Sequence, residues 1–329
     1  MKIKITELQK LIVEILSSKF YSKQEAEKIA EVLLYAELSG KNTQGVLKLT
    51  GTEPAQNIKP EYPAKILKET KVSALIDGGK SAGPLSAQVG VDTAIRIAKE
   101  SGFSVVGLNN TYSSIGAIGF YAKKMAEQNF VGIVMANCPR SVALADALEL
   151  VYGTNPMAFS FPTNEYPIVF DMSTAAITWY GLVRAKALGQ KLPDNVAIDK
   201  DGNVTTDPEA AMAGAILPFG NSHKGSGLGM VVELLAGALT GAGFVFDKGD
   251  KPDDWGTIFI AINPDLLIGI EQFKKNSSEL IKKVKGKKTK SGEIPHIPGY
   301  DTELKVKQIL AKGEIDIEDA ILNQLQSTQ

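Results

Sequence analysis

A glycine-rich segment around residue 225 carries the residues best suited to hold an anion. Four glycines lie close together, at positions 220, 225, 227 and 229, and a long apolar helix is predicted directly after them. Free backbone N–H groups at a helix start attract a phosphate or a carboxylate. Lys224 adds a positive charge, and His223 adds a titratable donor. The spacing does not match a Walker loop, and tight packing of a helix by small residues explains the glycines equally well.

Other polar segments follow predicted strands. YGTNP (152–156) is typical of a tight turn. Asp171, at the end of IVFDM, is expected to cap the helix after it. LNNTYSSIG (108–116) places hydroxyls and amides between a strand and a helix, where an N-cap and a binding residue have the same composition. No G-x-G-x-x-G motif follows a strand near the N-terminus, which argues against a standard Rossmann cofactor site.

The counts of histidine and cysteine exclude several kinds of site. His223 and His296 are the only histidines, so a zinc site built from several histidines is impossible. Cys138 is the only cysteine, so no internal disulfide or thiolate metal centre is expected. We therefore expect no metal site and a reducing, cytoplasmic location.

The composition is that of a soluble globular protein with a large core. The 329 residues are 44% hydrophobic and have a net charge of -1, which removes the electrostatic argument for binding nucleic acid. No apolar run reaches the ~18–20 residues that a membrane helix requires, so no membrane association is expected.

The predicted elements begin with two helices in the first forty residues. Thr6 with Gln9, and Ser22 with Glu25, are spaced as capping boxes ahead of apolar residues at helical spacing. An α/β pattern follows from about residue 65. Its elements are a strand and turn over 65–79, a helix over 86–100, a strand over 103–110, a helix over 116–128 and a strand over 130–136. This order predicts a partly parallel sheet.

The second half of the chain has more turns. The predicted elements are a strand over 168–172, a helix over 174–188, a hairpin over 198–204 around a D-G turn, a strand over 256–262, a helix over 264–284 and two short helices after Gly299. The lysine-rich run 282–292 is interpreted as a solvated loop, with attraction of a phosphate as the alternative.

Taken together, these segments resemble the malate/lactate dehydrogenase family of the non-Rossmann type, which includes ureidoglycolate and sulfolactate dehydrogenases, diketogulonate reductase and Δ1-piperideine-2-carboxylate reductases. The resemblance covers nearly the whole chain. It rests on SGKNTQGVLKL, GAIGFYA, ANCP, YGTNPMAF, PIVFDMST, TTDP, LPFGNSHKGSGLGMVVELLAGALTG and HIPGYD, in this order.

Membership implies an α/β fold with a mixed-sheet cofactor domain, an inserted sheet domain and a helical N-terminal region. The expected limits are 1–65 for the helical region, 66–120 with 250–300 for the cofactor domain, 121–249 for the inserted domain and 301–329 for C-terminal helices. It also implies an NAD- or NADP-dependent oxidoreductase of a small carboxylate, and a homodimer whose subunits share the active site.

The resemblance also assigns residues. The residues that would contact the cofactor are Cys138, Ile168, Asp171, Met172, Ser173, Thr174, His223, Lys224, Gly299, Tyr300 and Asp301. The Ser-His-Gly motif of the family appears as Thr43-Gln44-Gly45, so Gln44 occupies the position of the proton donor. Ser114, or Ser113 beside it, stands where a second histidine is expected, and Lys48 replaces an arginine. Lysine neutralises a carboxylate but cannot hold it with a planar fork.

The missing histidines leave three hypotheses. A ketone needs an acid when it receives a hydride, and neither an amide nor a hydroxyl gives up a proton readily. A protonated imine brings its own proton, which favours an imine reductase. The second hypothesis is a 2-oxo/2-hydroxy acid dehydrogenase with a relocated acid: His223, Tyr112, Tyr121 or a water. The third is a catalytically impaired protein that binds a nucleotide or a partner.

Overall fold

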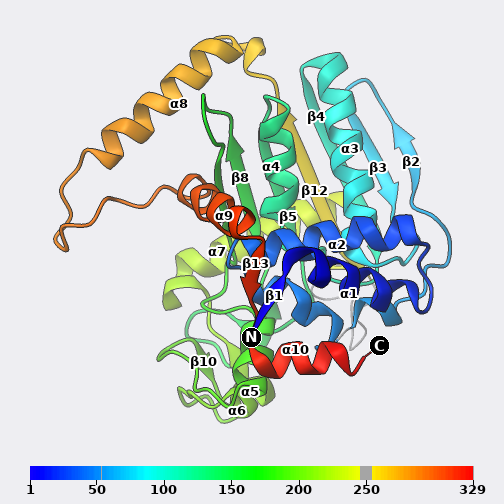
Figure 1. Ribbon diagram of the computed structural model, residues 1–329, viewed down its shortest axis with the longest axis vertical. Coiled ribbons are helices and arrows are strands. Elements are labelled where there is room, and N and C mark those ends of the chain that lie inside the picture. Colours follow the sequence, from blue (N-terminus) through cyan, green and yellow to red (C-terminus); the bar gives the residue numbers. More distant parts are fainter. Residues whose placement is uncertain (53, 245–253, 329) are drawn as a thin grey trace.

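The computed structural model describes residues 1–52, 54–244 and 254–328, and a seven-stranded mixed sheet forms its centre (Figure 1). Its spatial order is β2 (Lys65–Glu69), β3 (Ser73–Asp77), β4 (Phe103–Thr111), β12 (Trp255–Ile262), β5 (Val131–Ala136), β8 (Met157–Phe161) and β9 (Ile168–Met172). Only the β3–β4 pair is parallel, and the other five pairs are antiparallel. The partly parallel sheet is confirmed.

Two helices cover one face of this sheet. They are α3 (Gly83–Ser101) and α4 (Gly119–Glu127), and both were predicted to within three residues at each end. The apolar residues of α3 recur every three or four positions, so one stripe of the helix is buried against β4 and β12. On the other face, α7 (His223–Val232) and the π-helical turn Glu233–Gly237 pack against Met135, Met157 and Ile258.

The N-terminal region consists of α1 (Ile5–Ser17) and α2 (Lys23–Leu38). The capping box of Ser22 and Glu25 is confirmed, since each residue bonds the backbone N–H of the other. The capping box predicted at Thr6 is wrong, because α1 begins at Ile5 after Lys4 and has no side-chain cap. Instead, β1 (Lys2–Lys4) pairs with β13 (Glu314–Asp316), and the Ile5 N–H donates to the Gly313 carbonyl.

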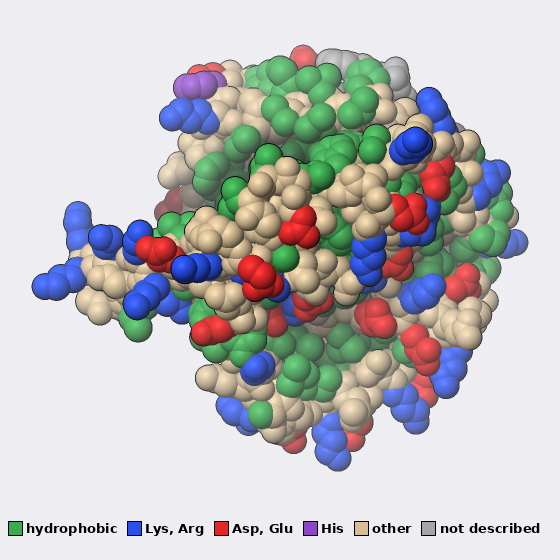
Figure 2. All heavy atoms as spheres, turned by 90° about the horizontal axis from the view of Figure 1, so that it is seen from above, with side chains coloured by type: hydrophobic (Ala, Val, Ile, Leu, Met, Phe, Trp, Pro, Cys, Tyr) green, Lys and Arg blue, Asp and Glu red, His purple; other side chains and the backbone are tan. Residues whose placement is uncertain are grey.

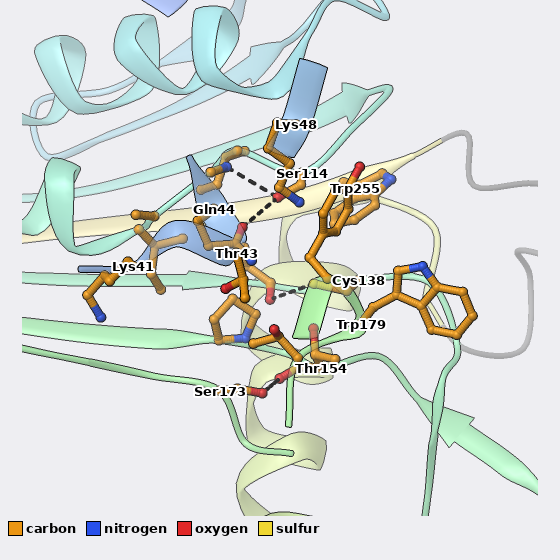
Figure 3. A pocket seen from close by; sticks show the side chains of 18 of the residues that line it. Lys41, Thr43, Gln44, Lys48, Ser114, Cys138, Thr154, Ser173, Trp179 and Trp255 are labelled. Atoms are coloured by element: carbon orange, nitrogen blue, oxygen red, sulfur yellow. Dashed lines mark hydrogen bonds between the residues drawn. The ribbon is translucent and has the colours of Figure 1, made fainter. Parts of the chain in front are cut away.

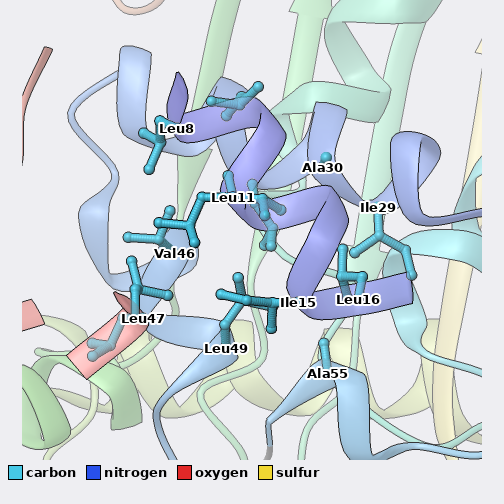
Figure 4. Packing of buried hydrophobic residues seen from close by; sticks show 14 of the residues in the cluster. Leu8, Leu11, Ile15, Leu16, Ile29, Ala30, Val46, Leu47, Leu49 and Ala55 are labelled. Carbon is cyan, nitrogen blue, oxygen red and sulfur yellow. The ribbon is translucent and has the colours of Figure 1, made fainter. Parts of the chain in front are cut away.

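The core of this region also anchors the segment that follows α2. Leu8, Leu11, Ile15 and Leu16 of α1 pack around Val46, Leu47 and Leu49 (Figure 4). These last three residues belong to the short 3-10 helix Val46–Leu49 and are at most 2% exposed. Burial of several aliphatic side chains contributes about 1.5–3 kcal/mol each, so the backbone on both sides of residue 48 is held firmly.

A smaller sheet lies below the first in Figure 1. It has the order β10 (Ala197–Ile198), β11 (Ala215–Ile216), β6 (Val142–Ala143) and β7 (Leu150–Tyr152), accompanied by α5 (Trp179–Ala187) and α6 (Pro208–Ala213). The helix that was predicted to begin at Thr174 begins at Trp179 instead, and the side chain of Thr178 caps it. The predicted turn over 198–204 is confirmed by an antiparallel bridge between Ile198 and Val204.

The small sheet lies wholly inside the range 121–249 that is expected for an inserted domain. However, β5, β8 and β9 from the same range hydrogen-bond into the large sheet. The expected boundary at 249/250 lies outside the described residues. The division into domains therefore stays a prediction.

The C-terminal part contains α8 (Ile270–Lys285), α9 (Tyr300–Lys312) and α10 (Asp319–Gln326). The helix predicted from Pro264 is divided into a 3-10 turn, Pro264–Leu266, and α8. The end of α8 and the chain after it project from the body, and lysine side chains cover this projection at the left of Figure 2. Within the described residues, no helix is long and apolar enough to cross a membrane.

Candidate active site

A cavity of about 500 Å³ lies where the N-terminal region meets the two sheets (Figure 3). Segments far apart in the chain form its walls: the turn after α2, the connection from β4 to α4, the chain after β5, the end of β9, and the first residues of α5 and β12. Of the predicted site residues, seven line it: Gln44, Lys48, Ser114, Cys138, Asp171, Met172 and Ser173. This volume is in the usual range for small-molecule sites.

Gln44 and Ser114 meet at the wall of the cavity. The Ser114 hydroxyl lies 3.5 Å from Gln44 Oε1 and can donate to it, as the dashed line in Figure 3 marks. The same hydroxyl accepts from the Gly116 N–H at 3.2 Å. The two positions that the family resemblance assigns to histidine are therefore adjacent here. Ser113, the fallback position, is buried and accepts from the Gly83 N–H instead.

Lys48 is a buried cation in the cavity wall. Its residue is only 7% exposed, and its Nζ lies 3.3 Å from the centre of the Tyr180 ring. An ammonium group over an aromatic face is stabilised by the ring quadrupole, but this does not neutralise its charge. Lys48 therefore contributes a buried positive charge to the cavity wall.

The carboxylate of Glu37 supports the turn that carries Gln44 and Lys48. Glu37 accepts hydrogen bonds from the Val46 N–H at 2.7 Å and from Asn42 Nδ2 at 2.6 Å. A Cβ at Gly45 would lie 2.0 Å from Glu37 Oε1, so only glycine fits here. Burial raises the pKa of Glu37 to about 7, and the hydrogen bonds only partly offset this. The nearby charges are Glu318, which raises the pKa, and Arg184, which lowers it.

This pKa predicts a pH-dependent stability. Because the pKa of Glu37 is about 7 in the folded chain and 4.5 for the unperturbed group, the folded state binds the proton more tightly. The free energy of unfolding should therefore fall as the pH rises between these values, by up to about 3 kcal/mol from this group. The free energy of unfolding would be measured in urea between pH 4.5 and 7. In Glu37→Gln, the decrease that Glu37 contributes should be missing. In the control Glu31→Gln, which changes an exposed residue, the decrease should remain. Identical pH profiles for Glu37→Gln and the unchanged chain would contradict this account.

Asp171 links β9 to the N-terminal region. Its Oδ2 accepts from the Gly119 N–H at 3.0 Å and lies 3.1 Å from Lys41 Nζ. The prediction that Asp171 caps the helix after it is wrong, because the carboxylate reaches the start of α4 and Thr178 caps α5. The ion pair with Lys41 leaves Asp171 neutralised at the edge of the cavity.

The structure brings the three predicted cofactor segments to the two ends of β9. At the start of the strand, the Val169 N–H donates to the Pro298 carbonyl, directly before Gly299. A Cβ at Gly299 would lie 2.4 Å from the Val169 nitrogen, and Gly299 has a φ of +76°. Beyond the other end, the Phe219 N–H donates to the Thr174 carbonyl, just before the glycine-rich turn. Ile168, Thr174 and these two segments lie outside the cavity lining.

At the start of β9, Tyr300 and Asp301 belong to a cluster of charged and aromatic side chains. The Asp301 carboxylate lies 2.8 Å from Lys285 Nζ and 3.0 Å from His296 Nδ1, and it accepts from the Ile297 N–H. These groups lower the pKa of Asp301. Lys285 also lies over the Tyr300 ring, and Tyr300 hydrogen-bonds Glu165. Asp301 is therefore held by its neighbours.

At the other end of β9, His223 and Lys224 form the exposed first turn of α7. Ser222, the residue before the helix, makes no side-chain hydrogen bond to the first turn of α7. Gly225 is required by packing, since a Cβ there would lie 2.3 Å from the Phe219 carbonyl oxygen. Gly227 has no atom within 4 Å of its missing Cβ, so packing does not explain that glycine.

Behind Cys138, buried amides fix the cavity wall. The Cys138 N–H donates to Asn155 Oδ1, and Asn155 Nδ2 donates to Glu233 Oε1 at 2.8 Å. Asn155, from the YGTNP turn, is completely buried and has a φ of +38°. Asn137, also completely buried, bonds the other oxygen of Glu233 and the Gly256 N–H. This network joins the π-helical turn to the start of β12.

Several lining residues were not predicted. Trp179 and Tyr180 begin α5, Trp255 begins β12, and Arg140 and Thr154 lie on the chain after β5 and before β8. Thr154 is the residue whose carbonyl accepts from Ser173 at 2.7 Å. The only available signal was that Trp255 stands directly before the predicted strand 256–262; Trp179 lies inside the predicted helix 174–188.

The proposed relocated acids do not line the cavity. Tyr121 is completely buried in the core and donates to the Ile115 carbonyl, and burial raises its pKa well above the usual value. Tyr112 and His223 are exposed and lie outside the lining. In the described part of the chain, no three His, Cys, Asp or Glu side chains are grouped to hold a metal ion.

A mixed-sheet fold without a Rossmann motif, and a cavity lined by Lys48 and Gln44, fit an enzyme of the non-Rossmann type that handles a carboxylate. Comparison with known families supports this class. The model of the malate/L-lactate dehydrogenase family matches residues 3–326. The chain belongs to this family, and it is an oxidoreductase.

Individual relatives match most or all of the length of this chain. Malate/(S)-sulfolactate dehydrogenase of Methanothermus fervidus is 34% identical over 97% of this chain and 94% of its own. The Δ1-pyrroline-2-carboxylate/Δ1-piperideine-2-carboxylate reductase of Pseudomonas putida is 31% identical over 85% and 84%. The structure of sulfolactate dehydrogenase from Methanocaldococcus jannaschii has a TM-score of 0.87 and 32% identity, and covers 100% of this chain and 96% of that one.

Proposed function

We propose that this protein reduces a small 2-imino carboxylate with NADH or NADPH, and that 2-oxo/2-hydroxy acids are its weaker substrates. The observation that carries the proposal is the pair Gln44 and Ser114, which meet in the cavity wall where a proton donor is expected. The second support is Lys48, a buried cation in the same cavity. A cytoplasmic location is part of the proposal, because the single Cys138 needs no oxidising compartment.

The residues present suit a substrate that carries its own proton. Lys48 attracts the substrate carboxylate and orients the neighbouring carbon. Gln44 Oε1 can accept a hydrogen bond from a protonated imine nitrogen, and Ser114 holds the amide in place. When the carbon receives a hydride, the electrons of the C=N bond move to nitrogen and leave a neutral amine, so no acid is required. A ketone would become an alkoxide, for which neither side chain can readily supply a proton.

The groups around β9 fit a dinucleotide. The nicotinamide, when bound, supplies or accepts the hydride. Met172, Ser173 and Cys138 line the cavity and would hold the nicotinamide end. The uncapped start of α7, with Lys224, suits a phosphate. Gly299 lies against Val169 at the opposite end of β9, and the remaining contacts of the nucleotide are expected at Ile168, Gly299, Tyr300 and Asp301.

An activity assay tests this function. The purified protein would be assayed with NADH and with NADPH on pyruvate, oxaloacetate and Δ1-piperideine-2-carboxylate. We expect turnover of the imine to exceed turnover of both 2-oxo acids. Equal or faster turnover of the 2-oxo acids would overturn the preference for imines. Nucleotide binding without turnover of any substrate would favour the alternative, a protein that binds a nucleotide or a partner without catalysis.

We further propose that two copies of the chain form a dimer through the face of α7 and the turn after it. Met230, Val231, Leu234 and Leu239 expose 43–64% of their surface there. The sheet face beneath is only partly covered, since Val105, Ile133 and Ile260 are half-buried. An apolar patch on both copies is what a two-fold dimer needs.

Substitution of one residue of this face tests the dimer. Leu234→Asp should give a monomer by light scattering, because a carboxylate would be buried without a partner. Leu267→Asp is the matched control, since Leu267 is 86% exposed in the turn before α8 and the substitution should not change the mass. A monomeric unchanged protein, or a dimer that survives Leu234→Asp, would refute the assignment of this face.

A further inference from the structure

Glu233 is a buried carboxylate outside the cavity lining and outside the predicted cofactor segments. It begins the π-helical turn after α7 and is 5% exposed. Its two oxygens accept hydrogen bonds from two completely buried amides, Oε1 from Asn155 Nδ2 at 2.8 Å and Oε2 from Asn137 Nδ2 at 3.3 Å. In the described part of the chain, no cation forms an ion pair with Glu233. A buried charge without a cation is costly, so its place in the structure needs an explanation.

The orientation of both amides is fixed by the backbone. Asn155 Oδ1 accepts from the Cys138 N–H at 3.0 Å, and Asn137 Oδ1 accepts from the Gly256 N–H at 2.7 Å. The amide nitrogens therefore face Glu233, and each also donates to a backbone carbonyl, those of Gly229 and Gly243. Turning either amide over would place its N–H groups against a buried backbone N–H. Both oxygens of Glu233 must accordingly accept, which an ionised carboxylate does and a glutamine amide does not.

The residues of this network lie directly behind one wall of the cavity. Asn137, Asn155 and Gly256 are each next in sequence to residues that line it. These lining neighbours are Ala136, Cys138, Thr154, Pro156 and Trp255. Figure 3 shows three of them, Cys138, Thr154 and Trp255, around the cavity. Because Glu233 follows the last residue of α7, the network also ties this wall to the helix whose start is the predicted phosphate site.

From these contacts we infer that Glu233 is a positioning residue for the hydride transfer: its ionised carboxylate holds two amides, and these hold the wall that carries Cys138, Thr154 and Trp255. This inference rests on the proposed function and adds to it a residue that touches neither ligand. Hydride transfer requires the two reacting carbons at a fixed distance and angle, so a small displacement of the wall slows the chemical step. Binding depends less on this wall, because Lys48 and the segments at β9 and α7 are assigned to it.

The substitution Glu233→Gln tests the inference, because it keeps the shape of the side chain and sets an N–H group against an N–H of Asn137 or Asn155. On the substrate that the unchanged protein reduces fastest, we expect kcat to fall about 10- to 100-fold. KM and the Kd for NADH should change less than about 3-fold, as when an interaction acts on the chemical step. The rate is expressed per NADH site counted by titration, so that unfolded protein is not scored as slow enzyme.

The matched control is Glu271→Gln, which changes an exposed glutamate and should retain the kcat of the unchanged protein. An unchanged kcat in folded Glu233→Gln would overturn the inference and leave the proposed function intact. A rise of KM alone would also overturn it, since the network would then shape binding and not the chemical step. Absence of turnover by the unchanged protein would instead overturn the proposed function.

A second substitution tests the pattern of donors and acceptors. In Glu233→Gln/Asn137→Asp the carboxylate moves to position 137, where one oxygen accepts from the Gly256 N–H and the other from the new amide at position 233. The oxygen of that amide still accepts from Asn155, and only the Gly243 carbonyl loses its donor. We expect the double variant to exceed both single variants in kcat by at least about 3-fold, because interacting residues are not additive. Losses that simply multiply would contradict the inference.

The emission of Trp255 gives a readout without substrate or cofactor. In a Trp179→Phe background it is the only indole, and it is 8% exposed. Glu233→Gln should shift its emission to longer wavelength, because a loosened wall admits water, and adding Asn137→Asp should shift it back. Identical spectra in all variants would show that Glu233 does not hold the wall. If Glu233→Gln alone does not fold, the comparison of the double variant with Asn137→Asp decides the question.

Discussion

Gln44→His should raise the reduction of 2-oxo acids by about 10²–10⁴-fold, which is the usual contribution of a positioned acid or base. Gln44 lines the cavity and is half-buried, so an imidazole at this position would face the substrate. A protonated imidazole can give its proton to the alkoxide that forms from a ketone. The measurement is kcat for pyruvate, phenylpyruvate and oxaloacetate at several pH values. Activity should fall as the pH rises through the imidazole pKa, ordinarily about 6.5.

The effect on imines separates this explanation from a general improvement of the site. Because a protonated imine needs no acid, Gln44→His should change imine reduction little. Ser114→His, alone and combined with Gln44→His, shows whether the second family position contributes, since Ser114 lies 3.5 Å from Gln44. An unchanged rate on all 2-oxo acids in a folded double variant would mean that proton donation does not limit this enzyme.

Lys48→Met should lower kcat/KM for every carboxylate substrate by about 10²–10³-fold, mainly through KM. The variant keeps the length of the side chain and removes the buried charge that faces the cavity. Removing one partner of a buried charge pair costs about 2–5 kcal/mol, or about 30- to 5,000-fold, and the expected loss lies within this range. Steady-state kinetics on pyruvate and on the preferred substrate measure it.

Two comparisons identify the cause. The affinity for NADH should change much less than kcat/KM in Lys48→Met, because the predicted cofactor segments lie along β9 and α7. Lys48→Arg should retain most activity, since it keeps the charge and can stack on Tyr180. Equal losses in Lys48→Arg and Lys48→Met would show that the fit of the side chain, and not its charge, is what matters.

Elements with strong local signals could be predicted from the sequence. The strand Ile168–Met172 has the predicted bounds, and the helix begun by Ser22 has the predicted cap. Both depend on residues that are neighbours in the chain. The start of α1 could not be predicted, because pairing of residues 2–4 with 314–316 decides it and a local capping pattern does not.

The position of β12 in the sheet is also decided by pairing between segments that are far apart in the sequence. β12 lies between β4 and β5 and is antiparallel to both. The strands β4 and β5, which follow each other in the sequence and are connected by α4, are therefore not neighbours in the sheet. Nothing local in GTIFIAI encodes that position. The same pairing brings Trp255 beside Thr111 and thereby into the cavity wall, which explains why sequence analysis missed this residue.

Residues of the site could be predicted where they belong to a segment that resembles a motif of the family. Gln44, Lys48 and Ser114 line one cavity, as the resemblance implied for the positions they occupy. Trp179, Tyr180 and Arg140 belong to no such motif, and only the packing of α5 against the turn after α2 brings Tyr180 to Lys48. Side chains that meet through tertiary packing have no signature in a single sequence.

The central claim is that a nicotinamide ring occupies the cavity beside Gln44 and Lys48. Titration with NADH and NADPH, with tryptophan excited and nicotinamide emission recorded, tests it directly, since the only two tryptophans line that cavity. We predict saturable quenching of tryptophan emission together with the appearance of energy transfer to the reduced nicotinamide. Folded protein whose tryptophan emission stays constant at saturating concentrations of both nucleotides would contradict the claim.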